Sequence, residues 1–214
     1  MPALSERSES KVQLLVATTN TGKLREIRSL LADVPVELVT LRDLEPIEEP
    51  EETGLTFEDN ARLKALYYSA HAGMTTVAED SGLVIDGLDG EPGVRSARFL
   101  DADATYPERF AAIFGRLAGP PEKNRAARFV CALAVADAGH IIYEARGTVE
   151  GEIAREPRGT AGFGYDPAFL PDGHTRTFGE MSSVEKHGLP PLGLGLSHRA
   201  RAFVKLAEIC LDQR

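Results

Sequence analysis

Residues 12–17 read VQLLVA, and they are followed by the polar turn TTNTGK at 18–23 and then by Leu24, Ile27 and Leu31. The short apolar run has the length of a strand, and the later apolar residues recur at helical spacing. A glycine and four small polar residues between them favour a tight connection. The stretch therefore predicts a strand, a turn and a helix, with the polar turn at the N-terminus of the helix.

The other elements follow from the same patterns of apolar spacing. Strands are expected at 36–40, 75–78, 83–85, 127–136 and 140–148, and helices at 56–72, 106–117 and 199–211. Glu79-Asp80-Ser81-Gly82 has strong turn chemistry, so we expect a turn there, with its polar residues at strand ends. The two longest strands are predicted to form a hairpin at Asp137-Ala138-Gly139 and the centre of the sheet. Because strands and helices intermingle without strict alternation, the pattern predicts a mixed α/β fold, a mixed β-sheet flanked by helices.

Composition sets the wider bounds. A chain of 214 residues that is 43% hydrophobic can bury an ordinary core, which excludes disorder as its main state. The net charge of −9 repels a phosphate backbone, so any anion site must be local and no nucleic-acid partner is expected. Residues 1–10 are polar and are predicted to be a disordered tail before a single domain at 11–214. With neither a secretory signal nor a run of roughly 20 apolar residues, we expect no membrane association and a cytoplasmic location.

The turn at 18–23 is the first segment that could carry chemistry. Its hydroxyls, amide, glycine and Lys23 stand at a helix N-terminus, where free N–H groups and the helix dipole favour an anion such as phosphate. It is not a Walker A loop, because Ala17 stands where the first glycine belongs and Leu24 where Ser or Thr would meet magnesium. Taken alone, the segment is equally explained as an N-capped turn with a solvated lysine.

Two acidic segments could supply carboxylates. Since strand side chains alternate, Asp80 can point into a cleft while Glu79 points away. Asp80 could then bind magnesium or take a proton from water. Glu51 and Glu52 lie at the end of an acidic, proline-containing stretch at 43–52 that is predicted to be an exposed loop. Each segment by itself is also explained as an ordinary turn or a solvated charge run.

The last third of the chain could recognise a base. Gly162-Phe163-Gly164 sets a ring between two glycines, so the backbone can approach a planar ligand and the ring can stack on it. Arg199 carries a fork of donors suited to a carbonyl or phosphate, whereas Lys186 is a point charge and His198 alone is most simply a surface histidine. A phosphate turn, magnesium carboxylates, a stacking ring and donors for a base edge are together the parts of a nucleoside triphosphate site.

In this combination the chain closely resembles the inosine/xanthosine triphosphate pyrophosphatase family. The matching segments, in order from residue 16 to residue 202, are VATTNTGKLREI, EETGLTFEDNARLKA, AEDSGL, PGVRSARF, GTAGFGYDPAF and EK…SHRARA. The resemblance implies an elongated mixed sheet in two lobes around a central nucleotide cleft, and a homodimer. It also implies a magnesium-dependent hydrolase acting on acid anhydrides, which converts ITP, dITP and XTP to the monophosphate and pyrophosphate and so removes them from the nucleotide pool.

The resemblance also assigns roles to residues at matching positions. Asp80 would ligate Mg²⁺ and accept the proton of the attacking water, and Glu52 or its neighbour Glu51 would supply the second metal carboxylate. The substrate would be held by Thr18, Thr19, Asn20, Thr21, Gly22, Lys23, Asn60, Lys64, Ser81, Phe163, Gly164, Tyr165, Asp166, Lys186, His198 and Arg199. The glycine-bracketed ring would stack on the purine. A donor from Arg199 or His198 to the carbonyl at position six would reject adenine, which has an amino group there.

One segment departs from the family pattern. Residues 187–196, HGLPPLGLGL, stand between Lys186 and Ser197, where the family usually has a short connection. The glycines and prolines predict an extended loop, which could change how Lys186 lies relative to Arg199 and so alter the base end of the site.

Two other functions fit parts of the pattern. One is a Maf-like nucleotide pyrophosphatase, against which the segments GFGYDP and SHR argue. The other is a non-catalytic module that senses a purine nucleotide, which the intact carboxylates disfavour because binding alone needs no general base.

Overall fold

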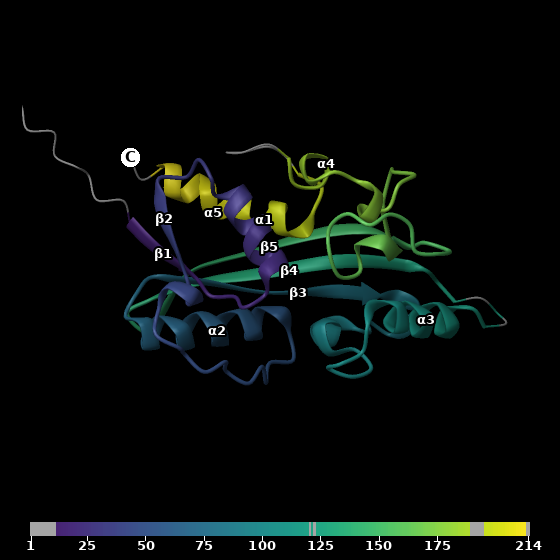
Figure 1. Cartoon of the computed structure of the whole chain (residues 1–214), viewed down its shortest axis with the longest axis horizontal. Helices are drawn as coiled ribbons and strands as arrows, with labels where there is room; N and C mark the ends of the chain where they lie inside the picture. The colour runs from purple at the N-terminus through teal and green to yellow at the C-terminus, as the bar shows by residue number, and fades with distance from the viewer. Residues whose placement is uncertain (1–11, 120, 122, 189–194, 213–214) are drawn as a thin grey trace, which may run out of the picture.

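A computed structural model describes residues 12–119, 121, 123–188 and 195–212. It contains a six-stranded sheet with helices on both faces (Figure 1), which confirms the predicted mixed α/β fold. The strands are β1 (Val12–Val16), β2 (Val36–Thr40), β3 (Thr76–Ile85), β4 (Ala126–Asp137), β5 (His140–Ile153) and β6 (Phe169–Pro171). The α-helices are α1 (Thr21–Leu30), α2 (Phe57–Ala72), α3 (Tyr106–Leu117), α4 (Ser183–His187) and α5 (His198–Asp212). The polar tail predicted at 1–10 lies outside the described residues.

The sheet is mixed, with the strand order β2-β1-β3-β4-β5-β6. Strands β2, β1 and β3 run parallel, whereas β3 to β6 pair antiparallel. The contact between β1 and β3 is short, because only Leu15 and Val16 of β1 pair with β3, opposite Thr76 and Val77. Strand β3 then continues for eight more residues, and just beyond Val77 its β1 side has no strand partner in the described part of the chain. This uncovered edge positions the site described below.

Strand β3 passes without interruption through residues 79–82, where the sequence predicted a turn between two short strands. That prediction is wrong, because all ten residues of β3 pair in register with β4. The long antiparallel partner satisfies the backbone groups that turn formers would otherwise satisfy locally. Gly82 serves close packing instead: a Cβ there would lie 2.3 Å from Ser96 Oγ and 2.6 Å from the Gly93 carbonyl. Asp80 consequently lies in the middle of a strand rather than at a strand end.

The helix ends and the long hairpin follow the sequence closely. Helix α2 begins at the cap Thr56, whose hydroxyl accepts a hydrogen bond from the Asp59 amide, and ends at Gly73 with a left-handed φ of 62°. Strands β4 and β5 are joined by Ala138 and Gly139, whose φ angles of 45° and 83° fit a two-residue hairpin turn. The predicted helices at 56–72 and 106–117 and the predicted hairpin are therefore confirmed.

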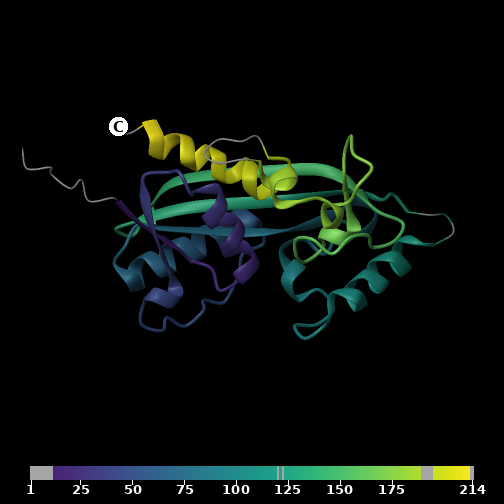
Figure 2. The ribbon, with the colours of Figure 1, turned by 45° about the horizontal axis from the view of Figure 1, so that its top comes forward.

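Helices cover the sheet on both faces. In Figure 1, α2 lies on one side of the strands, with α1 and α5 on the other. Residues of β1 and the one directly after it divide accordingly: Leu14 and Val16 pack in one core with residues of α1 and α5, and Leu15 and Ala17 pack in another with residues of α2. A third core joins α3 to the far ends of the long strands (Figure 2). No helix in the described residues is long and apolar enough to cross a membrane.

Candidate active site

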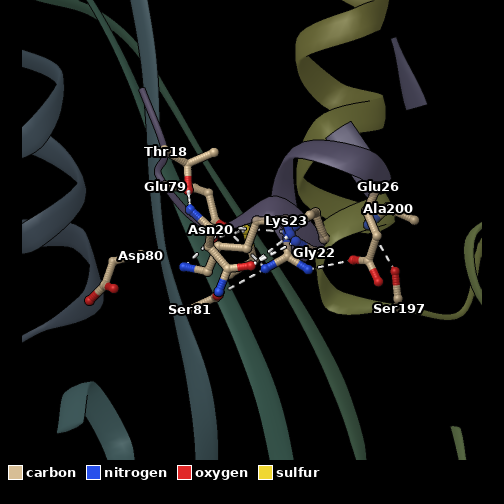
Figure 3. A network of polar contacts seen from close by, with 12 residues as sticks. Thr18, Asn20, Gly22, Lys23, Glu26, Glu79, Asp80, Ser81, Ser197 and Ala200 are labelled. Atoms are coloured by element: carbon tan, nitrogen blue, oxygen red, sulfur yellow. Dashed lines mark hydrogen bonds and ion pairs between the residues drawn. The ribbon is translucent and has the colours of Figure 1, made fainter. Parts of the chain in front are cut away.

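A cavity of about 250 Å³ lies along the uncovered edge of β3. Its walls come from the turn after β1, the middle of β3, helix α2, the segment after β5 and the start of α5. These segments are far apart in the sequence and meet where β1 stops short of β3. Figure 3 shows three of them close together: the turn after β1, the middle of β3 and the start of α5. Five of the described residues that line the cavity are lysines or arginines and five are glutamates or aspartates, so their formal charges are balanced before any ligand binds.

The turn between β1 and α1 is organised by Asn20. Its side-chain oxygen accepts hydrogen bonds from the backbone amides of Gly22 (2.9 Å) and Lys23 (3.1 Å), and its backbone N–H donates to Thr18 Oγ1 at 3.2 Å. Gly22 is required for space, since a Cβ there would lie 2.8 Å from the ring of Phe163. The cap commits the Asn20 oxygen to the protein and leaves its side-chain NH₂ to donate elsewhere.

Glu79 and Asp80 project to opposite sides of β3, as Figure 3 shows. Both nevertheless line the cavity, because the cavity follows the bare edge of the strand and reaches both of its faces. Asp80 accepts hydrogen bonds from Asn60 Nδ2 at 3.1 Å and from Lys64 Nζ at 3.4 Å. Burial raises the pKa of Asp80, and the positive charges of Lys64 and Lys23 offset only part of that rise. The carboxylate is thus a stronger proton acceptor than a solvated aspartate.

Glu52 faces Asp80 across the ammonium of Lys64. Lys64 Nζ lies 2.6 Å from Glu52 Oε1, and Arg98 Nη1 lies 3.0 Å from Glu52 Oε2. Burial raises the pKa of Glu52, but Lys64 and Arg98 outweigh it and hold that pKa below its usual value. Glu51 is exposed and lies outside the cavity lining. Of the two glutamates that the sequence offered, the structure brings Glu52 next to Asp80.

Arg199 is the centre of a buried ionic network. Its Nη1 donates to Glu26 Oε2 at 2.5 Å, and its Nη2 donates to Glu79 Oε1 at 3.0 Å and to Ser81 Oγ at 2.9 Å. Glu79 Oε1 also lies 3.2 Å from Lys23 Nζ. Burial raises the pKa of Glu79, but the cations of Arg199 and Lys23 outweigh it and keep the pKa well below its ordinary range. One carboxylate thereby links the lysine of the polar turn to the arginine of α5.

The ring of Phe163 lies beside two cations. Lys186 Nζ is 5.5 Å and the Arg199 guanidinium 5.7 Å from the ring centroid. The Phe163 amide donates to Asp166 Oδ2 at 2.9 Å, and Lys186 Nζ donates to the same oxygen at 2.6 Å and to Glu26 Oε1 at 3.1 Å. The ring, the lysine and the arginine are therefore held as one unit at this end of the cavity.

His198 is buried at the same end and stacks on Phe129, with ring centroids 4.8 Å apart and an interplanar angle of 14°. Burial lowers its pKa well below the usual value, and the charges of Arg199 and Lys186 lower it further, so the imidazole is neutral. Its Nδ1 has no hydrogen-bond partner among the residues that the structure describes. A buried ring nitrogen without a partner is a candidate contact for a ligand.

The two ends of the inserted segment 187–196 are tied together. The Ser197 amide donates to the Lys186 carbonyl at 2.9 Å, and His187 Nδ1 lies 2.9 Å from Ser197 Oγ. Lys186 and Arg199 therefore stand side by side through this junction, whatever the length of the loop between them. Residues 189–194, the main part of the predicted loop, lie outside the described residues.

Most of the residues that the resemblance assigned to the site meet in this cavity. Those that line it are Thr18, Thr19, Asn20, Lys23, Glu52, Lys64, Asp80, Ser81, Phe163, Gly164, Tyr165, Asp166, Lys186, His198 and Arg199. Those outside its lining are Thr21, Gly22, Glu51 and Asn60, of which Asn60 still reaches Asp80. The sequence predicted no role for Glu26 and Arg98. It also predicted that Glu79 points away from the cleft, whereas Glu79 lines the cavity. The position of Glu26 one helical turn after Lys23 was the only signal that could have found it.

Three comparisons with known proteins point to one family. The model of the Ham1 family matches residues 14–209. The "dITP/XTP pyrophosphatase" of Bradyrhizobium sp. is 53% identical over 206 residues, covering 94% of this chain and 95% of the relative. That of Rhodopseudomonas palustris is 52% identical over 203 residues, covering 93% and 96%. The solved structure of a HAM1 protein from Coxiella burnetii superposes with a TM-score of 0.84 at 34% identity, covering 94% of this chain and 99% of that chain.

Proposed function

This chain belongs to the Ham1 family, and from that premise we propose that it hydrolyses non-standard purine nucleoside triphosphates to the monophosphate and pyrophosphate. The observation that carries the proposal is a single cavity lined by a helix N-terminus, two facing carboxylates and an aromatic ring flanked by cations. The similarity to curated dITP/XTP pyrophosphatases supports ITP, dITP and XTP as the substrates. Because the chain matches the Ham1 family, we favour this activity over that of a Maf-like nucleotide pyrophosphatase.

We place the triphosphate at the turn between β1 and α1. The helix N-terminus favours negative charge there, and Lys23 lines the cavity beside it. Asn20 contributes its side-chain NH₂, because its oxygen is engaged in capping the helix. Thr18 and Thr19 line the same end of the cavity.

The donor set of the cavity fits magnesium. Glu52 and Asp80 offer the carboxylate oxygens that Mg²⁺ prefers, and the described residues contain no group of three acidic, histidine or cysteine side chains that could hold a metal alone. Two carboxylates completed by phosphate oxygens are typical of magnesium at nucleotide sites. When bound, magnesium would neutralise negative charge that develops on the phosphates.

Asp80 is the residue that we assign to proton transfer. A water that attacks a phosphorus of the α–β anhydride gives one proton to Asp80, and cleavage of the anhydride releases pyrophosphate. The burial that raises the pKa of Asp80 suits it to this task, since a general base works best when its pKa lies close to the pH of the medium. Asn60 and Lys64 hold its two oxygens and fix its direction.

The other end of the cavity is suited to a purine with a carbonyl at position six. Phe163 offers a face for stacking, and Arg199 keeps one Nη1 hydrogen beyond its bonds to Glu26, Glu79 and Ser81. His198 adds an unpartnered ring nitrogen. Adenine would set an amino group against the Arg199 donor, and a buried mismatch of this kind lowers kcat/KM by roughly 10⁴-fold.

A homodimer and a cytoplasmic location are the finer parts of the proposal. The homodimer is what the resemblance to the family implies, and the cytoplasmic location is inferred from the likeness to bacterial pyrophosphatases that cover nearly the same length as this chain. They stay predictions for this chain.

The proposal is tested by measuring pyrophosphate release from ITP, dITP, XTP, ATP and GTP with magnesium present. Fast release from the first three, with equimolar monophosphate, is the expected result. Tight binding of ITP without turnover would favour the purine-sensing module instead. Equal rates on ATP and ITP would contradict the assignment of the base end.

A further inference from the structure

The two carboxylates that we assign to magnesium have no free oxygen in the structure. Lys64 Nζ engages Glu52 Oε1 at 2.6 Å and Asp80 Oδ1 at 3.4 Å. The remaining oxygens, Glu52 Oε2 and Asp80 Oδ2, accept from Arg98 at 3.0 Å and Asn60 at 3.1 Å. The ammonium of Lys64 therefore takes the place between the carboxylates that a metal ion would need.

Burial makes this arrangement matter. The side chains of Lys64 and Asp80 are 9% and 7% exposed, and that of Glu52 is 17% exposed. Solvent screens charges weakly at such positions, so a divalent cation and the ammonium compete for the same two carboxylates. Arg98 is different, because its side chain is 44% exposed and, of the two carboxylates, contacts Glu52 and not Asp80 among the described residues. Lys64 is thus the principal competitor of the metal.

The cavity also offers Lys64 another partner once a nucleotide is present. Lys64 lines the same cavity as Thr18, Thr19 and Lys23, where we place the triphosphate. A phosphate oxygen there can accept the ammonium, which frees one oxygen on each carboxylate. The five lysines and arginines of the lining are already balanced by five glutamates and aspartates, so a triphosphate without metal would leave the site strongly negative. This charge balance also favours binding of the nucleotide together with a metal ion.

We propose that Lys64 is an internal counter-ion that blocks the metal site of the free protein and moves to the phosphates of the nucleotide, so that metal and nucleotide bind together. This inference rests on the proposed function and names an order of events within that site. In the free protein Lys64 neutralises Glu52 and Asp80 and metal affinity is low. In the complex Lys64 stabilises the phosphates, and the vacated oxygens face the metal. Because coupling is reciprocal, metal must also strengthen nucleotide binding by the same factor.

The test measures Mn²⁺ binding by the loss of its free-ion electron paramagnetic resonance signal, in the full chain without nucleotide. Lys64→Met removes the competing charge, and we expect it to bind Mn²⁺ about tenfold more tightly than the wild type, or better. Lys64→Arg keeps the charge and should stay as weak as the wild type. Lys205→Met, on the exposed side of α5, makes the same change in net charge away from the cavity and should change nothing. If Lys64→Met does not fold, Lys64→Gln replaces it.

The second arm repeats the titration with the non-hydrolysable α,β-methylene analogue of ITP. We expect the analogue to tighten Mn²⁺ binding strongly in the wild type and much less in Lys64→Met, whose site is already open. Equal or weaker Mn²⁺ binding by Lys64→Met without nucleotide would overturn the inference and leave Lys64 as a plain phosphate ligand. Failure of the wild type to bind the analogue would instead count against the proposed function, because the comparison without nucleotide does not depend on it.

Discussion

At the scale of single residues, Glu26 holds the base end of the cavity together. It lies within 3.1 Å of Lys186, 3.0 Å of His187 and 2.5 Å of Arg199. It also stands one helical turn after Lys23, so the same short helix carries the lysine of the phosphate end and the carboxylate that anchors the other end. A buried carboxylate with this many donors is expected to matter for stability as much as for binding.

We predict that Glu26→Gln lowers the free energy of unfolding by about 3–5 kcal/mol near neutral pH, because it leaves buried cations without their partner. The hydrogen bond from His187 and the charges of Arg199 and Lys186 outweigh burial and hold the pKa of Glu26 far below the 4.5 of an unfolded chain. Stability that depends on such a depressed pKa is present above pH 4.5 and lost as the pH falls. Below pH 4.5 the wild type should therefore lose about 1.4 kcal/mol per pH unit more than the variant.

Urea unfolding at pH 7 and at several values below 4.5 checks both parts of this prediction. Arg25→Gln, at the exposed neighbouring position, is the control and should behave like the wild type. Parallel pH profiles for the wild type and Glu26→Gln would show that Glu26 is not held ionised by its neighbours.

The ring of Phe163 should contribute to substrate affinity. Phe163→Leu removes the flat face that we assign to purine stacking, a contact worth about 1–3 kcal/mol. We therefore expect the KM for ITP to rise roughly 5- to 150-fold with little change in kcat, since stacking is equal in the ground and transition states. Phe163→Tyr keeps the ring and should retain the KM. Steady-state kinetics decide the matter, and an unchanged KM in Phe163→Leu would place the base elsewhere.

At the scale of elements, local signals predicted some segments well and failed where a distant partner decides. The cap Thr56 and the apolar spacing after it were enough to place α2, and a two-residue turn with glycine was enough to place the β4–β5 hairpin. Residues 79–82 look like a turn, yet they form the middle of β3 because β4 supplies a full ladder of partners. A prediction from local residues cannot include those backbone hydrogen bonds, because the strand that makes them lies about 50 residues further along the chain.

The site divides in the same way. The turn at 18–23 could be predicted because its function depends on contiguous residues at one helix N-terminus. The role of Glu26 could not, since its partners Lys186 and Arg199 are 160 and 173 residues away in the chain. The second face of β3 was missed for a structural reason: Glu79 reaches the cavity only because β1 ends early and exposes the strand edge.

The β4–β5 turn gives a prediction at the element scale. Ala138 has a φ of 45°, a conformation that costs residues with a Cβ roughly 1–2 kcal/mol and that asparagine tolerates better. Ala138→Asn should therefore stabilise the protein by about 0.5–1 kcal/mol, and Ala138→Val should destabilise it by a similar amount because β-branched residues disfavour positive φ. Thermal unfolding of the two variants measures the difference. Equal melting temperatures would mean that the turn relaxes without cost.

At the scale of the whole molecule, the mixed sheet itself creates the site. Strands β3 and β4 contribute to all three cores, so the cavity lies beside a strand that all three cores share. A nucleotide that contacts both ends of the cavity should stabilise the entire fold. At a concentration of 100 times its Kd, the α,β-methylene analogue of ITP with magnesium should raise the free energy of unfolding by about 2.7 kcal/mol. This corresponds to a rise in the melting temperature of roughly 5–10 °C. The ATP analogue at the same concentration should give a much smaller shift, and equal shifts would contradict selection at the base end.

The proposed hydrolysis depends most on Asp80, which lies on the uncovered edge of β3 and accepts the proton of the attacking water. The most direct test is single-turnover pyrophosphate release from ITP by Asp80→Asn, beside Glu49→Gln, which also loses one acidic side chain from the cavity lining. We predict that Asp80→Asn slows release by about 10³-fold, within the range for loss of a general base, and that Glu49→Gln stays close to the wild type. Release by Asp80→Asn at the wild-type rate would show that Asp80 is not the proton acceptor.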